Sequence, residues 1–418
     1  MRSRKASYGS TVPWSTWRGS RGLVAVLTPA LVATFACGEA VESPTGPASE
    51  PALATAAATL SFRQVSAGWS FHTCGVTTDD RAYCWGGNWV GQLGDGTTTN
   101  RLTPVAVAGG LRFRHVSVGV EHTCGVTTDD RAFCWGNGGG GVLGVGPTDL
   151  MVNPRPLAVV GGLKFRQVDA GYAHNCGVTR DSQVFCWGGN HMGQLGDGTI
   201  TSRLTPVPLI GDRSFRQVSA GWTHTCAVTP TYQAYCWGSN RTGELGAGTD
   251  VNRRQRPTLV AGGHLFMQVS AGGQQVQGHT CAVTTGGKAF CWGYGRWGQI
   301  GDGNTYNHFR PGGVAGGHSF RHVSAGVTHT CGVTTGERAY CWGGNFLGEL
   351  GDGTTALRSR PVAVLGGLDF RQLDAGGNYT CGRTPAANAY CWGFNLEGQL
   401  GDGTTTDRLK PRAVAGAM

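Results

Sequence analysis

The 418-residue chain lacks several features that would place it in a common structural class. Only 14% of its residues are charged, which is too few for a coiled coil or a long solvated helix. The one apolar run that could enter a membrane, residues 23–36, is too short to span a bilayer as a helix. The 72 glycines follow no Gly-X-Y period, which excludes a collagen-like chain. A content of 39% hydrophobic residues and 13 tryptophans excludes a disordered chain.

What the chain does have is an internal repeat, which its cysteines mark. Fourteen of the 15 cysteines form seven pairs whose members stand ten positions apart. The pairs are Cys74 with Cys84, Cys124 with Cys134, Cys176 with Cys186, Cys226 with Cys236, Cys281 with Cys291, Cys331 with Cys341, and Cys381 with Cys391. They recur at intervals of 50 to 55 residues, and a Trp-Gly dipeptide follows the second cysteine every time. A period near 50 residues indicates propeller blades or a solenoid.

Each repeat unit contains four short apolar segments separated by Gly, Asp and Pro, and no segment shows a sustained helical period. Such segments are typical of short β-strands, here named a to d in chain order. The units start near residues 62, 113, 165, 215, 266, 320 and 370. We therefore predict an all-β fold, a seven-bladed β-propeller of four-stranded blades over residues 60–418. A β-solenoid is the weaker alternative, because its rungs are usually shorter than 50 residues.

The units also carry recognisable motifs. They contain Ala-Gly-x-x-His-Thr, a hairpin that ends in Tyr-x-Trp-Gly, and Asn-x-x-Gly-Gln-Leu-Gly-Asp-Gly, as at His224, Trp237 and residues 190–198. These motifs resemble the regulator of chromosome condensation repeat, and the chain is also similar to a family of secreted bacterial propellers that inhibit β-lactamases. The resemblance implies a seven-bladed propeller. For activity it implies two alternatives. One is guanine-nucleotide exchange, and the other is inhibition of an enzyme that the propeller binds as its protein partner.

The N-terminus resembles an export signal. Five basic residues precede the apolar run, and no acidic residue occurs before Glu39, so residues 1–36 are predicted to be a signal peptide. Ala36-Cys37-Gly38 resembles a bacterial lipoprotein cleavage site, which predicts lipidation of Cys37; an ordinary signal peptide with an incidental cysteine is the alternative. Residues 38–59 have the composition of a flexible tether. We expect export to the bacterial cell envelope with a lipid anchor, or secretion.

The paired cysteines are predicted to form seven disulfides. A short turn around Asp79 places Cys74 opposite Cys84 in a hairpin, within disulfide reach. Reduced, buried thiols and a zinc-type site that includes His72 are the alternatives. In the seventh unit Tyr379 replaces the histidine while both cysteines persist, which favours pairing over metal. The histidines of the repeat are expected to hydrogen-bond loop backbone: His72, His122, His174, His224, His279 and His329.

A Gly-Asp-Gly sequence is typical of a turn and recurs in five units. Its aspartates are Asp95, Asp197, Asp302, Asp352 and Asp402. One carboxylate per turn is too few for a calcium loop, and Ala247 replaces the aspartate in the fourth unit. We therefore predict structural turns and no metal site.

The variable positions of the units predict a binding face. The a–b and c–d connections emerge on one face of a propeller, and most variable residues fall there. Aromatic and arginine side chains are enriched in binding hot spots. The predicted partner-binding residues are Trp69, Trp89, Tyr172, His191, Trp222, Arg241, Arg296, Trp297 and Phe346. Packing between neighbouring blades is the alternative role for each of them.

Charge and motifs limit the function further. Without the five basic residues of the leader the net charge falls from +9 to +4, and no basic cluster indicates nucleic-acid binding. No nucleophile–base pair, phosphate loop or paired carboxylates indicate an enzyme or a cofactor. We expect a monomeric, non-enzymatic propeller that binds a protein or glycan partner and contacts the membrane only through its lipid.

Overall fold

A computed structural model describes residues 59–147, 151–249 and 251–416. The predicted signal peptide, Cys37 and all but the last residue of the predicted tether lie outside the described residues. Within the described part, no helix has the length and apolar character needed to cross a bilayer.

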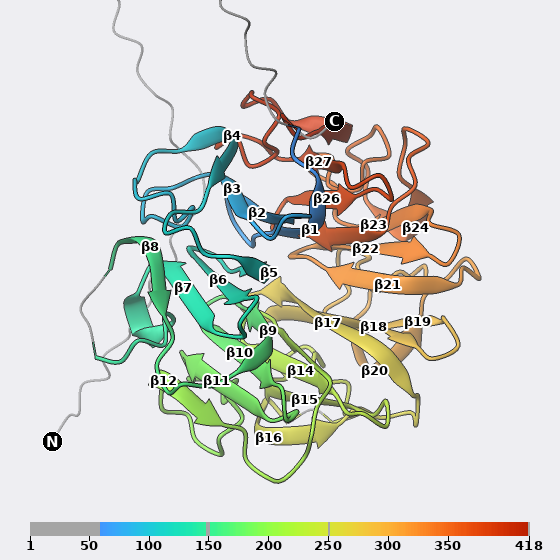
Figure 1. The fold of residues 1–418 in the computed structure, drawn as a ribbon. Coiled ribbons are helices and arrows are strands. Elements are labelled where there is room, and N and C mark those ends of the chain that lie inside the picture. Colours follow the sequence, from blue (N-terminus) through green and yellow to red (C-terminus); the bar gives the residue numbers. More distant parts are fainter. Residues whose placement is uncertain (1–58, 148–150, 250, 417–418) are drawn as a thin grey trace, which may run out of the picture. The chain divides into compact units, whose positions relative to one another are not determined.

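Seven four-stranded antiparallel sheets surround a central axis, as predicted (Figure 1). Blade 1 comprises β1 (Phe62–Ala67), β2 (His72–Thr77), β3 (Ala82–Gly86) and β4 (Arg101–Ala106). Blade 2 comprises β5 (Phe113–Val118), β6 (His122–Thr127), β7 (Ala132–Gly136) and β8 (Asn153–Ala158). Blade 3 comprises β9 (Phe165–Ala170), β10 (His174–Thr179), β11 (Val184–Gly188) and β12 (Arg203–Pro208). Blades 4 and 5 comprise β13 (Gln217–Ala220), β14 (His224–Val228), β15 (Ala234–Ser239), β16 (Arg253–Leu259); and β17 (Phe266–Gln274), β18 (Gln277–Thr284), β19 (Ala289–Gly293), β20 (His308–Gly313).

Blades 6 and 7 comprise β21 (Phe320–Ala325), β22 (His329–Thr334), β23 (Ala339–Gly343), β24 (Arg358–Ala363); and β25 (Gln372–Ala375), β26 (Tyr379–Arg383), β27 (Ala389–Gly393), β28 (Arg408–Ala413). A single 3-10 turn, η1 (Gly139–Gly141), lies in the c–d connection of blade 2, the one helical element of the described residues. Every blade is built from consecutive strands, so the first and last blades share no strand. β1 nevertheless lies beside blade 7, where Phe62 N–H donates to the Ala387 carbonyl at 2.7 Å (Figure 1).

All seven predicted disulfides are present. The paired cysteines are opposed residues of strands b and c, with Cα atoms 4.0–4.1 Å apart. The bonds join Cys74 to Cys84, Cys124 to Cys134, Cys176 to Cys186, Cys226 to Cys236, Cys281 to Cys291, Cys331 to Cys341, and Cys381 to Cys391. Each of these cysteines is fully buried, and the bonding excludes the alternatives of free thiols and of a zinc site in this structure. Seven disulfides indicate an oxidising compartment.

The core lies between neighbouring blades, where the repeated tryptophans are fully buried. Trp135 of blade 2 packs on Phe113, with ring centroids 5.7 Å apart, and its Nε1–H donates to the Gln92 carbonyl of blade 1 at 3.0 Å. The glycine after each tryptophan lets two chain segments approach closely. At Gly86, with φ of +102°, a Cβ would lie 2.3 Å from the Phe71 carbonyl oxygen.

The expectation that the histidines bond loop backbone is wrong, because they bond side chains of the next blade. His72 Nε2 lies 2.9 Å from Thr123 Oγ1, and the Thr123 hydroxyl in turn donates to the Gln92 carbonyl. Equivalent pairs follow around the ring: His122 with Asn175, His174 with Thr225, His224 with Thr280, His279 with Thr330, and His329 with Thr380. Burial lowers the pKa of His72 to about 3, so its ring is neutral and serves a structural role.

Candidate functional site

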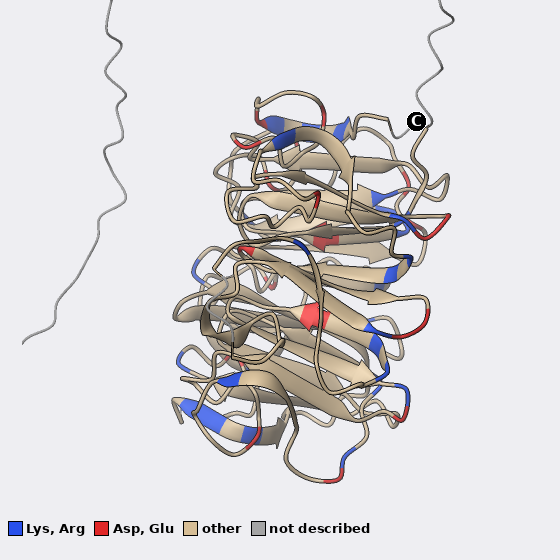
Figure 2. Ribbon diagram, turned by 60° about the vertical axis from the view of Figure 1, so that its left-hand side comes forward, with Lys and Arg blue, Asp and Glu red and all other residues tan. Residues whose placement is uncertain are grey.

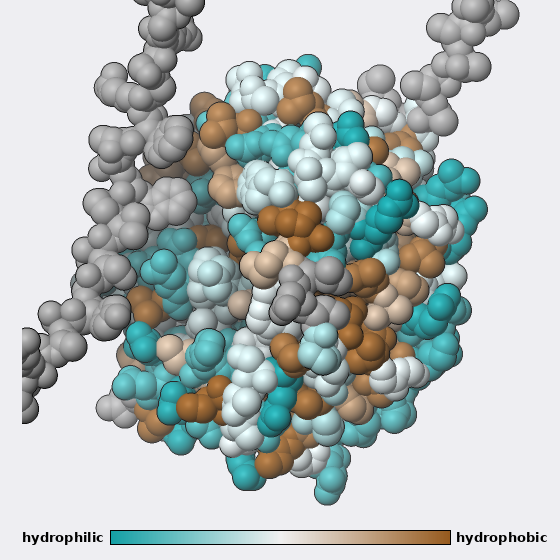
Figure 3. Space-filling view, turned by 90° about the vertical axis from the view of Figure 1, so that its left-hand side faces the viewer, coloured by the Kyte–Doolittle hydropathy of each residue, from teal (hydrophilic) through white to brown (hydrophobic). Residues whose placement is uncertain are grey.

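The exposed apolar side chains gather on the face formed by the a–b and c–d connections, here called the loop face. Among the described residues, eleven of the 20 exposed large hydrophobic side chains lie in these connections, against four in the b–c and d–a connections. The eleven are Trp89, Met151, Val152, Tyr172, Ile200, Val251, Val276, Tyr306, Phe346, Leu357 and Leu396. Figure 3 shows hydrophobic side chains as separate patches among hydrophilic ones on one side of the molecule. The loop face therefore offers several exposed apolar side chains for contact.

The charges do not form a field of one sign. Figure 2 shows basic and acidic residues side by side at many loop ends. Ion pairs join Arg63 to Asp80 and Arg131 to Asp129. The exception is β16 of blade 4, the lowest strand in Figure 1, which carries Arg253, Arg254 and Arg256.

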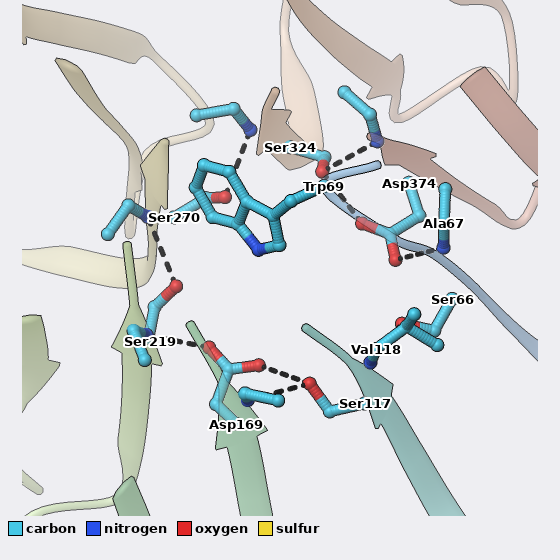
Figure 4. A pocket seen from close by; sticks show the side chains of 15 residues that line it. Ser66, Ala67, Trp69, Ser117, Val118, Asp169, Ser219, Ser270, Ser324 and Asp374 are labelled. Atoms are coloured by element: carbon cyan, nitrogen blue, oxygen red, sulfur yellow. Dashed lines mark hydrogen bonds between the residues drawn. The ribbon is translucent and has the colours of Figure 1, made fainter. Parts of the chain in front are cut away.

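A small cavity of about 90 Å³ lies on the propeller axis, where the seven innermost strands end. Two adjacent positions of each strand a line it, and the first of them holds serine in five blades and aspartate in two (Figure 4). These serines and aspartates are Ser66, Ser117, Asp169, Ser219, Ser270, Ser324 and Asp374, which we call the axial ring. The cavity has room for several water molecules but is smaller than ordinary ligand pockets.

The axial ring joins every blade to the next. Each side-chain oxygen accepts a hydrogen bond from a backbone N–H of the following blade, as when Ser66 Oγ accepts from Val118 at 3.2 Å. The same bond is made by Ser117 to Ala170, Asp169 to Ala220, Ser219 to Ala271, Ser270 to Ala325, Ser324 to Ala375 and Asp374 to Ala67. The last of these closes the circle between blades 7 and 1. The axial ring is therefore a continuous belt of hydrogen bonds.

The two aspartates differ from the serines in charge. Ser117 donates to Asp169 Oδ1 and Ser324 to Asp374 Oδ1, both at 3.0 Å. Burial raises the pKa of Asp169, and burial together with the neighbouring Asp169 raises the pKa of Asp374 to about 7. Both carboxylates line the same cavity. Their oxygens are engaged by serine and backbone donors, and the described residues contain no group of three or more His, Cys, Asp or Glu that could hold a metal.

An aromatic cluster begins at the edge of this cavity with Trp69. Trp69, from the a–b connection of blade 1, lines the cavity (Figure 4). Its ring reaches Trp222 of blade 4, with ring centroids 6.4 Å apart. Trp222 stacks on Tyr172 of blade 3, with centroids 3.7 Å apart and an interplanar angle of 14°. The structure thus brings three of the predicted binding residues together, and we call them the axial aromatic cluster. Tyr172 is 41% exposed and is its most accessible member.

The other predicted residues form smaller groups around the loop face. Trp297 and Phe346 pack edge to face at 5.2 Å, and Phe346 is 53% exposed. Trp89 packs on Phe71 at 5.3 Å. His191 and Arg241 line one shallow pocket together with Met192, Asn252 and Arg253. Arg296 is exposed on the c–d connection of blade 5. Trp69, Trp222 and Trp297 are half-buried. The alternative role, packing between blades, therefore fits these three better than it fits the other predicted binding residues.

Two features were missed in the sequence. The axial ring aspartates occupy the serine position of the repeated Phe-Arg-Gln-Val-Ser-Ala-Gly motif in units 3 and 7, so an alignment of the units would have found them. Phe71, which supports Trp89 and lies 6.2 Å from Phe394 of blade 7, stands in a variable connection and carries no such signal.

Comparisons with known proteins agree with this architecture. A family model of the RCC1-like domain matches residues 26–311, more than half of the chain. Models of the regulator of chromosome condensation (RCC1) repeat match residues 320–349 and 388–418. The ultraviolet-B receptor UVR8 of Arabidopsis thaliana is 32% identical over 254 residues, 60% of this chain and 46% of the receptor. The chain therefore spans less than half the length of that relative.

Solved structures show the same fold. Human WBSCR16 superposes with a TM-score of 0.73 at 21% identity, over 80% of this chain and 95% of that one. Prp20p from Saccharomyces cerevisiae superposes with a TM-score of 0.70 at 19% identity, over 81% of this chain and 87% of that one. The repeat period, the ring of seven four-stranded sheets and the family matches together establish that the chain belongs to the family of RCC1-like domains.

Proposed function

We propose that the chain is an extracytoplasmic, non-enzymatic binding protein that recognises a protein partner through its loop face. The observation that carries the proposal is the gathering of exposed apolar side chains in the a–b and c–d connections. These connections stand on blades that are each cross-linked by a buried disulfide, so they start from a rigid support. Binding residues on loops held by a rigid scaffold are a common arrangement in proteins.

The relatives support a protein partner in preference to a glycan. Yeast Prp20p has binding properties toward Gsp1p and histones, and it has also been crystallised bound to Kap60. At 19% identity this likeness concerns the fold, so guanine-nucleotide exchange is not carried over to this chain. The seven disulfides support an extracytoplasmic site of action. Lipidation of Cys37 remains a prediction from the sequence, which detergent phase partitioning of the mature protein tests.

The binding face can be tested with three of the predicted binding residues that are exposed on the loop face. We expect the triple substitution Trp89→Ser, Tyr172→Ser and Phe346→Ser to abolish capture of a partner from a cell-envelope extract. These side chains are 38–53% exposed, so their removal should leave the melting temperature nearly unchanged. Capture is measured by quantitative mass spectrometry against the unmodified chain.

The matched control lies on the opposite face, in the d–a connections. Val160→Ser, Leu265→Ser and Leu365→Ser remove side chains of similar exposure, 39–50%. This variant should retain the partner. Loss of the partner from the control, or its retention by the loop-face variant, would refute the proposed face.

A further inference from the structure

Five blades hold a carboxylate in the same way at the end of their c–d connection. In blade 1, Asp95 Oδ1 accepts from Thr97 N–H at 2.9 Å and from the Thr97 hydroxyl at 2.7 Å. Asp95 Oδ2 accepts from Arg101 Nε at 2.9 Å. Asp197, Asp352 and Asp402 repeat this arrangement with their own threonine and arginine, and Asp302 does so with Asn304 and His308. The carboxylate side chains are 1–13% exposed, so the site is enclosed.

Blade 4 keeps this loop but lacks the carboxylate. Ala247 stands where the other blades have aspartate. Asn240 Nδ2 donates to the Thr249 and Val251 carbonyls at 3.0 Å each, as Asn88 Nδ2 donates to the Thr97 and Thr99 carbonyls in blade 1. Arg254 pairs with Gly238 in the sheet, as Arg101 pairs with Gly86. The backbone that surrounds the carboxylate in other blades is therefore preserved.

The donors of the missing carboxylate are also preserved, and they have no acceptor. Thr249 Oγ1 and Arg254 Nε are both buried without a hydrogen-bond partner, although their counterparts in blade 1 bind Asp95. Arg310 of blade 5 adds a further cation, since its guanidinium lies against Gly248. An unpaired guanidinium nitrogen and an unpaired hydroxyl in an enclosed site carry a substantial cost.

We propose that blade 4 binds the carboxylate group of a ligand in the place that aspartate occupies in the other blades. The Thr249 hydroxyl would donate to one oxygen, and Arg254 would donate to the other. Ala247 retains the Cβ, so the missing group is the carboxylate itself. This site stands independently of the proposed function, although it lies in a c–d connection of the loop face.

Carbon-13-labelled formate is the probe, because formate is a carboxylate without a side chain. We expect excess broadening of the formate resonance in the presence of the protein, and its loss in Ala247→Asp, where an internal carboxylate fills the site. Ala247→Asp should also raise the melting temperature by a few degrees, since it pairs the orphaned donors. The matched gain-of-site variant is Asp352→Ala, which removes the same carboxylate from blade 6. It should bind a second formate and roughly double the broadening.

Two further arms complete the test. A capped Gly-Asp-Gly peptide that displaces formate would identify a protein side chain as the source of the carboxylate, whereas binding of formate alone would identify a small free carboxylate. Both results support the site. Equal broadening by the unmodified chain and by Ala247→Asp would overturn it. Formate broadening by Asp250→Asn but not by the unmodified chain would also overturn the proposal. It would mean that Asp250, which lies outside the described residues, supplies the carboxylate in the unmodified chain.

Discussion

The axial ring shows how one residue can change the electrostatics of a propeller and still keep the hydrogen bond that joins its blade to the next. Asp374 accepts the Ala67 N–H at 3.0 Å, as serine does at the equivalent position of five blades. A carboxylate in the same place must also lose its hydration when it ionises. Burial raises the pKa of Asp374 from the ordinary value of 3.8 to about 7. Asp374 therefore keeps its proton in the folded chain at pH values where the unfolded chain has released it.

This raised pKa has a defined effect on stability. The contribution of Asp374 to the free energy of unfolding is fully present below pH ~4. It is lost as the pH rises toward about 7, because unfolding then releases a proton. Relative to the unmodified chain, Asp374→Ser should therefore gain stability between these pH values. The gain is at most about 4 kcal/mol, the equivalent of three pKa units. Denaturant unfolding from pH 4 to pH 8 measures the difference.

Asp352→Ser is the control, because the pKa of this carboxyl group is lowered and not raised. Burial opposes its ionisation, but hydrogen bonds from Thr354 and Arg358 outweigh burial and lower the pKa of Asp352. Its contribution is present above the ordinary pKa and is lost only as the pH falls below it. Asp352→Ser should be destabilised by a constant amount from pH 4 to pH 8. A pH-independent difference for Asp374→Ser as well would show that the carboxylate of Asp374 is ionised in the folded chain.

At the scale of the blade, the b–c hairpin is the cross-linked element. Each disulfide joins strands b and c across ten residues of sequence. In the chain-entropy model, a loop of this length stabilises the folded state by about 2–3 kcal/mol. We expect Cys331→Ala with Cys341→Ala to lower the free energy of unfolding by about this amount and to increase hydrogen exchange in β22 and β23. Hydrogen exchange in blade 3 should stay unchanged, since each blade carries its own cross-link.

The oxidation state of the paired cysteines is the control for this double substitution. The unmodified mature protein should show no alkylatable thiol among the fourteen paired cysteines until it is reduced and unfolded, because every one of these sulfurs is bonded and buried. If the unmodified protein alkylates at Cys331 and Cys341 without reductant, the double substitution measures cavity formation and not the loss of a disulfide.

Within a blade, the sequence predicts the structure well because its contacts are local. The ten-residue spacing of Cys74 and Cys84 sets the hairpin register, and the repeated Trp-Gly marks the buried strand c. Contacts across the ring carry no comparable signal. Trp69 and Trp222 come from blades 1 and 4, and only closure of the ring brings their connections together over the axis. The repeat predicts where the variable loops emerge, but not which of them meet.

At the scale of the whole molecule, the seam between blades 7 and 1 has no covalent continuity. The seams between other blades are bridged by a d–a connection, but here two ends of the propeller meet. Gln372 and Asp374 bond the backbone of β1, and Tyr379 takes the place of the ring histidine. The Tyr379 hydroxyl donates to the His72 carbonyl at 2.5 Å and accepts from Gly68 N–H at 2.8 Å. Ring closure therefore combines backbone bonds with side-chain bonds, and the longer tyrosine supplies two of the latter.

Tyr379→Phe should loosen this seam selectively. The substitution removes the hydroxyl that donates to the His72 carbonyl and accepts from the Gly68 N–H. Because the Gly68 N–H also donates to the His72 carbonyl at 3.0 Å, we expect only the net value of a hydrogen bond to be lost, about 0.5–1.5 kcal/mol. Because the apolar ring remains, the blade should keep its packing while β1, β2 and β26 exchange their amide hydrogens faster. Hydrogen exchange followed by mass spectrometry measures this, with β13 and β14 of the distant blade 4 as the internal reference.

Tyr390→Phe is the matched control in the same blade, because Tyr390 packs on Phe370 at 6.5 Å and bonds nothing across the seam among the described residues. Faster exchange spread evenly over all seven blades would mean that the ring opens as one cooperative unit, and that the seam is no weaker than the rest.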